Sequence, residues 1–318
     1  MKSFSPSELK TILHSKRANI FYLEKCRVLV KDGRVVYLTE EKKQNAYYNI
    51  PIANTTVILL GIGTSITHSA VRMLAAASVL IGFSGNGGTP LIAGNEVEWL
   101  SPQSEYRPTE YMQGWMSFWF DENKRLNVAK SFQKSRINFL KNIWNKDRDL
   151  KQEGFYLDDF EINSALEAFT QEIDGAKKSG DLLQKEALLT KQLYKTAAKI
   201  TKIEDFTRDR EAADLANTFL NHGNYLAYGL AATTLWVLGI SHSFAVMHGK
   251  TRRGALVFDV ADLIKDAVVL PWSFICAKEK ASEQEFRSQI LLKFTETQAL
   301  DFMFDCVKEA ALFGGSKS

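Results

Sequence analysis

No proline occurs between Pro108 and Pro271, and this long gap constrains the fold more than any other feature of the sequence. A proline inside a helix removes a backbone hydrogen bond and clashes with the preceding turn, so its absence leaves the whole interval free to form helices. Apolar residues in the interval recur every three to four positions, which is the spacing of an amphipathic helix. We therefore expect roughly six or more helices there, which together form an α-helical domain.

The residues before this interval favour β structure. In CRVLVKDGRVVYLT two valine-rich runs flank Asp32-Gly33, a dipeptide that suits the positive φ angles of a two-residue hairpin turn. Farther along, the apolar runs Val57–Leu60 and Val79–Phe83 bracket a glycine turn and a helix, whose cap we expect at Thr64 or Ser65. The stretch therefore predicts strand, turn, helix and strand, in that order.

The predicted fold is α+β, with a β-rich N-terminal domain over residues 1–104 and a larger all-α-helical domain over residues 105–318. We place the junction near SPQSEYR, at about residues 101–107. Gly61 and Gly63 follow a strand as in dinucleotide-binding proteins, but isoleucine occupies position 66, where that motif needs a third glycine. A tight strand-to-helix turn is the simpler explanation of these glycines.

The overall composition indicates a folded cytoplasmic protein with no membrane partner. The net charge is only +3, so a basic surface for nucleic acid must come from local clustering. The cysteines form no CxxC pair, which favours reduced thiols, and MKSFSPSELK lacks the apolar core of a signal peptide. The uncharged stretch from Tyr225 to Met247 is long enough to span a bilayer, but its hydroxyl and histidine side chains favour a buried core helix.

Residues 247–266, MHGKTRRGALVFDVADLIKD, pose the main chemical question. Asp259, Asp262 and Asp266 lie three and four positions apart, so a helix would place them on one face, where like charges repel. Their neighbours are apolar, and a buried carboxylate is costly unless it is protonated or meets a cation. The sequence therefore predicts a positive charge beside this helix.

A further inward carboxylate is predicted at Glu186. In GDLLQKEALLTKQLYKTAAKI, residues 180–200, steps of 100° per residue place Glu186 in the middle of an apolar stripe and the lysines on the other side. One interpretation is a buried or half-buried ion pair, because structural pairs also bury acids. The other interpretation is a metal ligand.

Glu186, His248, Asp259 and Asp262 together suggest a metal site. Carboxylate oxygens and one imidazole nitrogen suit a hard divalent cation, so we expect Mg²⁺ or Mn²⁺. Such an ion would supply the positive charge that the aspartates require. For His248 alone, a hydrogen-bonded structural role is about equally compatible with the sequence. Asp266 shares the helix face but could be an exposed acid, so it stands outside the expected ligand set.

Basic residues next to the expected metal site suggest phosphate binding. Lys250, Arg252 and Arg253 follow His248 closely, and both arginines and metal ions stabilise charge on phosphoryl oxygens. A solvated basic loop is the plainer interpretation of such a short run.

Another basic segment lies at 124–148, where Asp147 is the only acid. We select Lys130, Lys134 and Lys141 as candidate DNA contacts on a locally basic helix. The remaining basic residues of the segment are Lys124, Arg125, Arg136, Lys146 and Arg148. The interleaved aromatic side chains, which we expect to pack in the core, are Phe132, Phe139 and Trp144.

Four segments in this order resemble the CRISPR-associated integrase of spacer acquisition, the nuclease of the adaptation module. They are IPIANTTVILLGIGTSITHSAVRMLAAASVLIGFSGNGG, LLQKEALLTKQLYKTAAK, NTFLNHGNYLAYGL and MHGKTRRGALVFDVADLIKD. Each motif is modest by itself, but four in one order across almost the whole chain are specific. The spacing between His248 and Asp259 and the overall length look most like subtype I-F.

The resemblance implies that Glu186, His248 and Asp262 hold the metal, with Asp259 beside them as a ligand or as a supporting acid. It also implies a homodimer formed largely through the N-terminal domains. Two such dimers would flank the second Cas adaptation protein, which in subtype I-F is fused to the helicase-nuclease.

The implied activity is metal-dependent DNA endonuclease and integrase chemistry on double-stranded and branched DNA. A 3′-hydroxyl of a short fragment would attack a phosphodiester at the CRISPR repeat boundary. One alternative is a DNA-binding scaffold without catalysis, which would use the same basic helices. Another is a different metal-dependent phosphohydrolase, although the adjacent His-Asp pair typical of one large class of these enzymes is missing.

Overall fold

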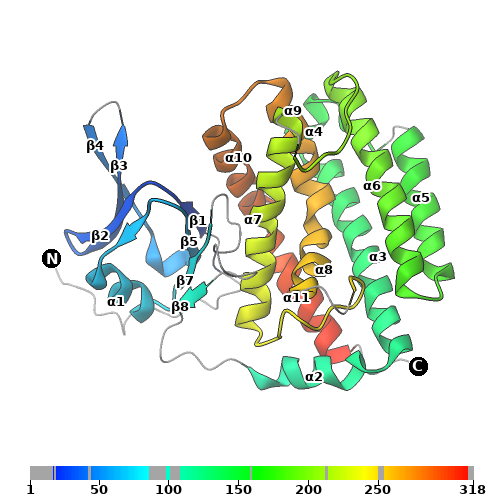
Figure 1. Ribbon diagram of the computed structural model, residues 1–318, viewed down its shortest axis with the longest axis horizontal. Helices are drawn as coiled ribbons and strands as arrows, with labels where there is room; N and C mark the ends of the chain where they lie inside the picture. Colours follow the sequence, from blue (N-terminus) through cyan, green and yellow to red (C-terminus); the bar gives the residue numbers. More distant parts are fainter. Residues whose placement is uncertain are drawn as a thin grey trace. The chain divides into compact units, whose positions relative to one another are not determined.

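The computed structural model describes residues 17, 19–41, 44–85, 98–100, 108–157, 160–211, 214–249 and 254–313. The chain divides into two compact units, Met1–Tyr106 and Arg107–Ser318 (Figure 1). The first unit is β-rich and the second is helical, which confirms the predicted α+β class. The assignment of dimerisation to residues 1–104 and of catalysis to residues 105–318 stays a prediction.

The N-terminal unit contains two four-stranded sheets. In the first sheet β1, β5 and β7 are parallel and β8 is antiparallel to β7, with bounds Asn19–Leu23, Thr55–Leu60, Leu80–Phe83 and Glu98–Leu100. The order of the second sheet is β4-β3-β2-β6, with bounds Gln44–Asn49, Arg34–Glu41, Arg27–Lys31 and Ser65–Ile66. The 3₁₀ turn η3 (Ile52–Asn54) and helix α1 (His68–Ala76) complete the described elements of this unit.

The turn chemistry of this unit follows the sequence closely. Strands β2 and β3 pair as far as Lys31 and Arg34, and both residues of the connecting Asp32-Gly33 turn have positive φ, which confirms the hairpin. The expected helix cap is wrong by two or three residues, because Ser65 enters strand β6. Thr67 caps α1 instead, since its hydroxyl accepts a hydrogen bond from the Ala70 amide at 3.3 Å.

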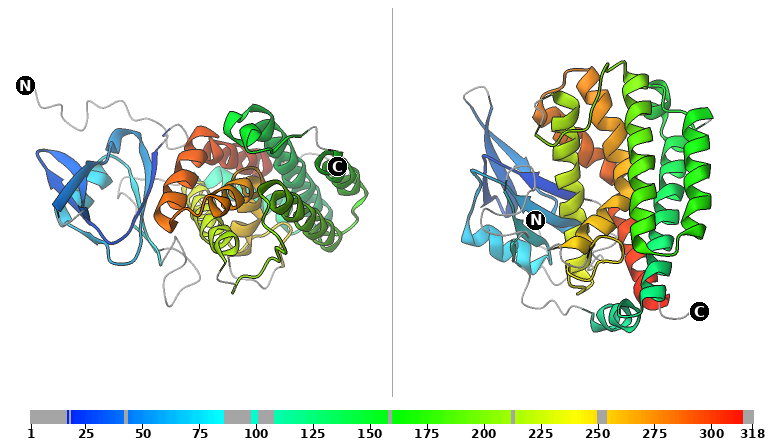
Figure 2. Two further views of the ribbon diagram at one scale, coloured as in Figure 1. Left: turned by 90° about the horizontal axis from the view of Figure 1, so that it is seen from above. Right: turned by 45° about the vertical axis from the view of Figure 1, so that its right-hand side comes forward.

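All regular elements in the described part of the C-terminal unit are helices. They are α2 (Thr109–Trp119), α3 (Glu122–Lys146), α4 (Arg148–Gln152), α5 (Phe160–Gly175), α6 (Ser179–Thr201), α7 (Leu215–Val237), α8 (Ala255–Ile264), α9 (Leu270–Lys278), α10 (Glu283–Glu296) and α11 (Ala299–Phe313). Helices α3, α5 and α6 pack side by side, and α7 contacts α8 and α9 (Figure 2). The expected helical domain is confirmed.

One turn of π-helix, η5 (Lys265–Val269), joins α8 to α9 without a break. Single π turns are rare and occur often at functional sites, where they re-aim side chains. Pro271 follows in the first turn of α9, directly after the π turn. Helices α3 and α7 both pack against η5, so this irregular turn lies at the centre of the helical unit.

Helix α7 contains the first half of the long uncharged stretch. Thr233 and Thr234 are fully buried, and their hydroxyls donate to the carbonyls of Gly229 and Leu230 at 2.8 and 3.1 Å. The polar groups are therefore satisfied inside the protein, as expected of a core helix. None of the helices in the described ranges combines the length and hydropathy that a membrane span requires.

Candidate active site

Asp259 is a buried carboxylate that organises the chain before α8. Its Oδ2 accepts hydrogen bonds from the amides of Val246 and Met247 at 2.7 and 3.1 Å. Its Oδ1 accepts from the His248 amide at 3.0 Å and lies 2.6 Å from His248 Nδ1. Four contacts from one short segment therefore satisfy both oxygens of this carboxylate, which is only 3% exposed.

His248 is held by Asp259 so that its other ring nitrogen faces Asp262. The side chain is 19% exposed, and Nε2 lies 4.0 Å from Asp262 Oδ2. Burial by itself would lower the pKa of His248, but the hydrogen bond and the negative charge of Asp259 raise it above the ordinary value. The Asp259–His248 pair therefore fixes the orientation of the ring and leaves Nε2 available for chemistry.

Asp262 is buried and meets a lysine from the π turn. The Lys265 ammonium contacts Asp262 Oδ1, and it also lies over the ring of Tyr228 on α7, 5.4 Å from the centroid. Burial would raise the pKa of Asp262, but Lys265, Arg136 and His248 together hold it below the ordinary value. This carboxylate is therefore ionised at neutral pH.

Arg136 of α3 is the buried cation of a further cluster. Its side chain is 2% exposed, Nε donates to Asp266 Oδ2 at 2.7 Å, and Nη1 donates to Glu186 Oε1 at 2.9 Å. Nη2 donates to the Thr190 hydroxyl, which in turn donates to Glu186 Oε1 at 3.0 Å. Burial opposes the charge of Arg136, but the two carboxylates raise its pKa, so the guanidinium remains charged.

Arg136 and its partners show which positive charge the carboxylates of the acidic helix meet. Asp266 is 4% exposed and paired, so its interpretation as an exposed acid is wrong. Burial raises the pKa of Asp266 despite the opposing charge of Arg136. In the described residues the positive charges beside the carboxylates are Arg136 and Lys265. Glu186 points inward as predicted, is 17% exposed, and forms the half-buried ion pair that was the plainer of its two interpretations.

A pocket of about 290 Å³, which includes space open to solvent, adjoins the Arg136 cluster. Its walls come from α3, α6, α7 and the α8–α9 junction. The lining residues are Arg136, Glu186, Thr190, Tyr194, Leu220, Asn224, Lys265, Asp266, Val269 and Leu270. Lys265 lines this pocket and also contacts Asp262, so it connects the pocket with the neighbouring Asp262 and His248 side chains.

The three lysines of α3 that were selected as DNA contacts differ in what they bind in the structure. Lys134 pairs with Asp174 of α5 at 2.6 Å, and Lys130 donates to the Asp174 carbonyl at 2.9 Å. Lys134 in turn lowers the pKa of Asp174. Lys141 is half-buried and forms no ion pair with any described residue. Since exposed pairs exchange readily with solvent, DNA binding by these lysines stays a prediction.

Arg136, in contrast, is not part of a basic surface, because it is buried and neutralised. Its aromatic neighbours on α3 are also buried, which confirms their predicted place in the core; they are Phe132, Phe139 and Trp144. The other predicted phosphate contacts lie outside the described residues; they are Lys250, Arg252 and Arg253.

The contacts that Arg136, Lys265 and Thr190 make in the site were not predicted from the sequence. Signals for two of them exist, because Lys265 lies three positions after Asp262 and Thr190 lies four positions after Glu186, so each pair shares a helix face. Arg136 carried no such signal among the many basic residues of its helix.

The donor set fits a divalent ion in part. Two ligands of one Mg²⁺ or Mn²⁺ ion, each about 2.1 Å away, are at most about 4.2 Å apart, so the 4.0 Å between His248 Nε2 and Asp262 Oδ2 is compatible. Glu186 Oε1 is occupied by Arg136 and Thr190, although Oε2 accepts no hydrogen bond from the described residues. Within these residues no three His, Cys, Asp or Glu side chains are grouped closely enough to hold a metal ion.

Comparisons with known proteins identify the family. A family model described as "CRISPR associated protein Cas1" matches residues 21–290. The chain is 55% identical to a "CRISPR-associated endonuclease Cas1" of Pseudomonas aeruginosa over 98% of both chains. It is 54% identical to a protein of the same name from Pectobacterium atrosepticum over 97% of both chains.

Solved structures share the fold at lower sequence identity. A TtCas1–DNA complex is 22% identical with a TM-score of 0.63, and the match covers 94% of this chain and 92% of that one. A casposase bound to its integration product is 16% identical with a TM-score of 0.67, covering 94% and 91%. A Cas6-RT-Cas1–Cas2 complex is 12% identical with a TM-score of 0.61, covering 98% of this chain and 36% of that one.

Proposed function

Because this chain belongs to the Cas1 family of CRISPR-associated proteins, we propose that it is a metal-dependent DNA endonuclease and integrase that inserts short foreign DNA fragments as spacers into a CRISPR array. The observation that carries the proposal is the 55% identity to a named Cas1 endonuclease along nearly the whole of both chains. The buried, oriented pair of His248 and Asp259 beside the ionised Asp262 supplies suitable side-chain chemistry.

The proposed reaction is a transesterification. The 3′-hydroxyl oxygen of the fragment forms a new bond to a phosphorus atom at the repeat boundary, and the existing bond from that phosphorus to a 3′-oxygen breaks. The attacking hydroxyl loses its proton and the departing oxygen gains one. One phosphodiester replaces another, so no nucleotide energy source is needed.

Glu186, His248 and Asp262 are the residues we propose as metal ligands, and Asp259 is the acid that orients His248. A bound divalent ion would polarise the reacting phosphate and stabilise the charge on its oxygens. Asp259 holds Nδ1, so the lone pair of Nε2 points away from it and toward Asp262. Glu186 would bind the metal ion either through Oε2 or, after losing its hydrogen bond to Arg136, through Oε1.

The family implies dependence on a divalent metal, and Mg²⁺ or Mn²⁺ is our specific proposal. Carboxylate oxygens with one imidazole nitrogen favour these hard ions over thiolate-seeking metals. The described cysteines are separate and buried, so they offer no competing thiolate site in the described structure.

We propose double-stranded and branched DNA as substrates, a homodimer, and a second Cas adaptation protein as partner. Two of the structures with the same fold support DNA and a Cas2-containing assembly, since one is a DNA complex and another a Cas1–Cas2 complex. Fusion of the partner to the helicase-nuclease, as in subtype I-F, belongs to the same proposal. Because cellular DNA is the target, we expect the protein to act in the cytoplasm.

The test is integration of a labelled duplex into a repeat-bearing plasmid, with divalent metal and with or without the partner. His248→Ala should lose about 100-fold or more of strand transfer while DNA binding is retained, because several kcal/mol of charge stabilisation are removed. His68→Ala is a matched control, since His68 is exposed on α1. Undiminished strand transfer by His248→Ala would favour a different active site, and binding without any transfer by the intact protein would favour a scaffold.

A further inference from the structure

Arg208 carries a positive charge that no described carboxylate neutralises. It lies in the connection between α6 and α7, where Nη1 donates to the Asp209 carbonyl at 2.9 Å and to Asn217 Oδ1 at 2.8 Å. Nη2 donates to Asn221 Oδ1 at 2.6 Å. All three acceptors are neutral, and no salt bridge to Arg208 is formed within the described ranges. The guanidinium is therefore held in place while its charge remains available.

The two asparagines that hold Arg208 are themselves fixed. Asn217 is 1% exposed, and its Nδ2 donates to the Thr207 carbonyl at 2.9 Å and to Asp214 Oδ2 at 2.7 Å. Asn221 Nδ2 donates to the Arg210 carbonyl at 2.9 Å. Because both amide nitrogens are occupied by acceptors, both amide oxygens must point toward the guanidinium. The structure thus orients Arg208 with hydrogen bonds and adds no opposing charge.

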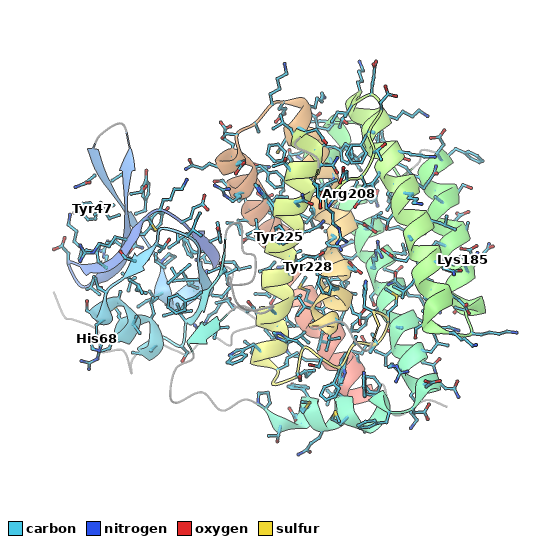
Figure 3. All side chains as sticks on the ribbon, in the orientation of Figure 1. Tyr47, His68, Lys185, Arg208, Tyr225 and Tyr228 are labelled. Carbon is cyan, nitrogen blue, oxygen red and sulfur yellow. The ribbon has the colours of Figure 1, made fainter. Side chains whose placement is uncertain are left out.

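Arg208 lies on the same side of α7 as the candidate active site. Asn217, Asn221, Asn224 and Tyr228 recur at intervals of four, three and four residues, so they share one face of α7. Arg208 binds one end of this face and Tyr228 lies toward the other end (Figure 3). The Lys265 ammonium lies over the ring of Tyr228. Asn224, between Asn221 and Tyr228, lines the pocket beside Glu186. Asn221 and Tyr228 are seven positions apart, which is about 10 Å along a helix.

Tyr194 provides an independent link between Arg208 and the pocket. This residue of α6 lines the pocket, and burial raises the pKa of its phenol. Lys265 and Arg208 both act to lower the same pKa, so both cations lie near the phenol oxygen. Lys265 therefore lines the pocket itself, and Arg208 lies next to it on the side of Tyr194.

We propose that Arg208 binds a backbone phosphate of a DNA strand that lies along this face of α7, and that Asn217 and Asn221 are its positioning residues. A planar guanidinium recognises phosphate through paired N–H donors, and an arginine already held in place loses less side-chain freedom on binding. Lys134, by contrast, is exposed and already paired with Asp174. This inference rests on the proposed function, because it requires DNA at the pocket.

The test measures binding of a labelled branched duplex as a function of salt concentration. One phosphate contact contributes about 0.9 to the slope of log K against log salt for duplex DNA, or about 0.7 for a single strand. Arg208→Gln should therefore reduce the slope by about that amount and weaken binding about eightfold at 0.1 M salt. Lys185→Gln is the matched control, because it makes the same charge change on an exposed part of α6 (Figure 3). We expect less than a twofold effect from it.

Asn221→Asp tests the charge of Arg208 without removing its hydrogen-bond acceptor. It keeps the acceptor for Arg208 but adds a carboxylate, so it should neutralise the guanidinium and reduce the salt slope as Arg208→Gln does. Thermal unfolding of each variant identifies any loss of folding, and Asn221→Asp decides the matter if Arg208→Gln does not fold. If the folded variants give the same salt slope as the wild-type protein, Arg208 only stabilises the fold and the inference is overturned. If the wild-type protein itself fails to bind DNA, the proposed function fails instead.

Discussion

Replacing Arg136 with methionine should strongly destabilise the helical unit. The substitution keeps a long side chain but removes the cation shared by Glu186 and Asp266, whose oxygens lie 2.9 and 2.5 Å from the guanidinium nitrogens. Removing one partner of a buried ion pair leaves the other charge desolvated and unpaired. Arg136 is 2% exposed and Asp266 only 5%, so water cannot replace the lost partner without local opening.

The expected cost lies near the lower end of the range for such pairs. Breaking a buried pair typically costs about 3–5 kcal/mol. Two features moderate the loss: Glu186 is 17% exposed, and burial already raises the pKa of Asp266, which makes protonation of its carboxyl easier. We therefore expect about 3 kcal/mol, which for a unit of this size lowers Tm by about 6–12 °C.

Urea and thermal unfolding of the wild-type protein and Arg136→Met would measure this cost. Arg125→Met is a matched control on the same helix, because Arg125 is also buried but donates to the Trp119 carbonyl and has only an exposed carboxylate nearby. A double-mutant cycle with Asp266→Asn should give a coupling energy of about 1–3 kcal/mol. The reasoning would be refuted if Arg136→Met cost no more than Arg125→Met, or if the coupling energy were zero.

Three further predictions follow from the described contacts. Asp259→Asn should lower the pKa of His248, measured by NMR, and weaken Mn²⁺ binding about 10–100-fold; an unchanged pKa would show that Asp259 does not support the ring. Burial raises the pKa of Cys276 and Cys306 to about 12 from 9.0, so only the unfolded thiols ionise between these values. The stability contribution of each thiol should therefore fall by about 1.4 kcal/mol per pH unit above pH 9, and alkylation at pH 8 should need denaturant; rapid native labelling would contradict this. Gly114→Ala places a Cβ 2.1 Å from a backbone carbonyl of α11 and should cost about 1–3 kcal/mol in urea unfolding, whereas unchanged stability would mean that α2 shifts freely.

Much of the architecture was determined by local sequence. The absence of proline between Pro108 and Pro271 permitted most of the helical unit, and Asp32-Gly33 set the hairpin, because both effects act through the backbone of the residues concerned. Periodicity likewise predicted that Glu186 points inward. Local patterns were less accurate at the cap of α1, since Ser65 pairs with β2 and the helix starts only after Thr67.

Tertiary structure alone decided what each buried carboxylate meets. Arg136 lies 50 residues from Glu186 and 130 from Asp266, so no local pattern connects them. Asp259 is satisfied mainly by backbone amides, which every sequence contains and no motif marks. Helical periodicity specifies which face of a helix is buried, but the partner across that face depends on how distant helices pack. For this reason the inward orientation of Glu186 was predictable from the sequence, and the cation that it meets was not.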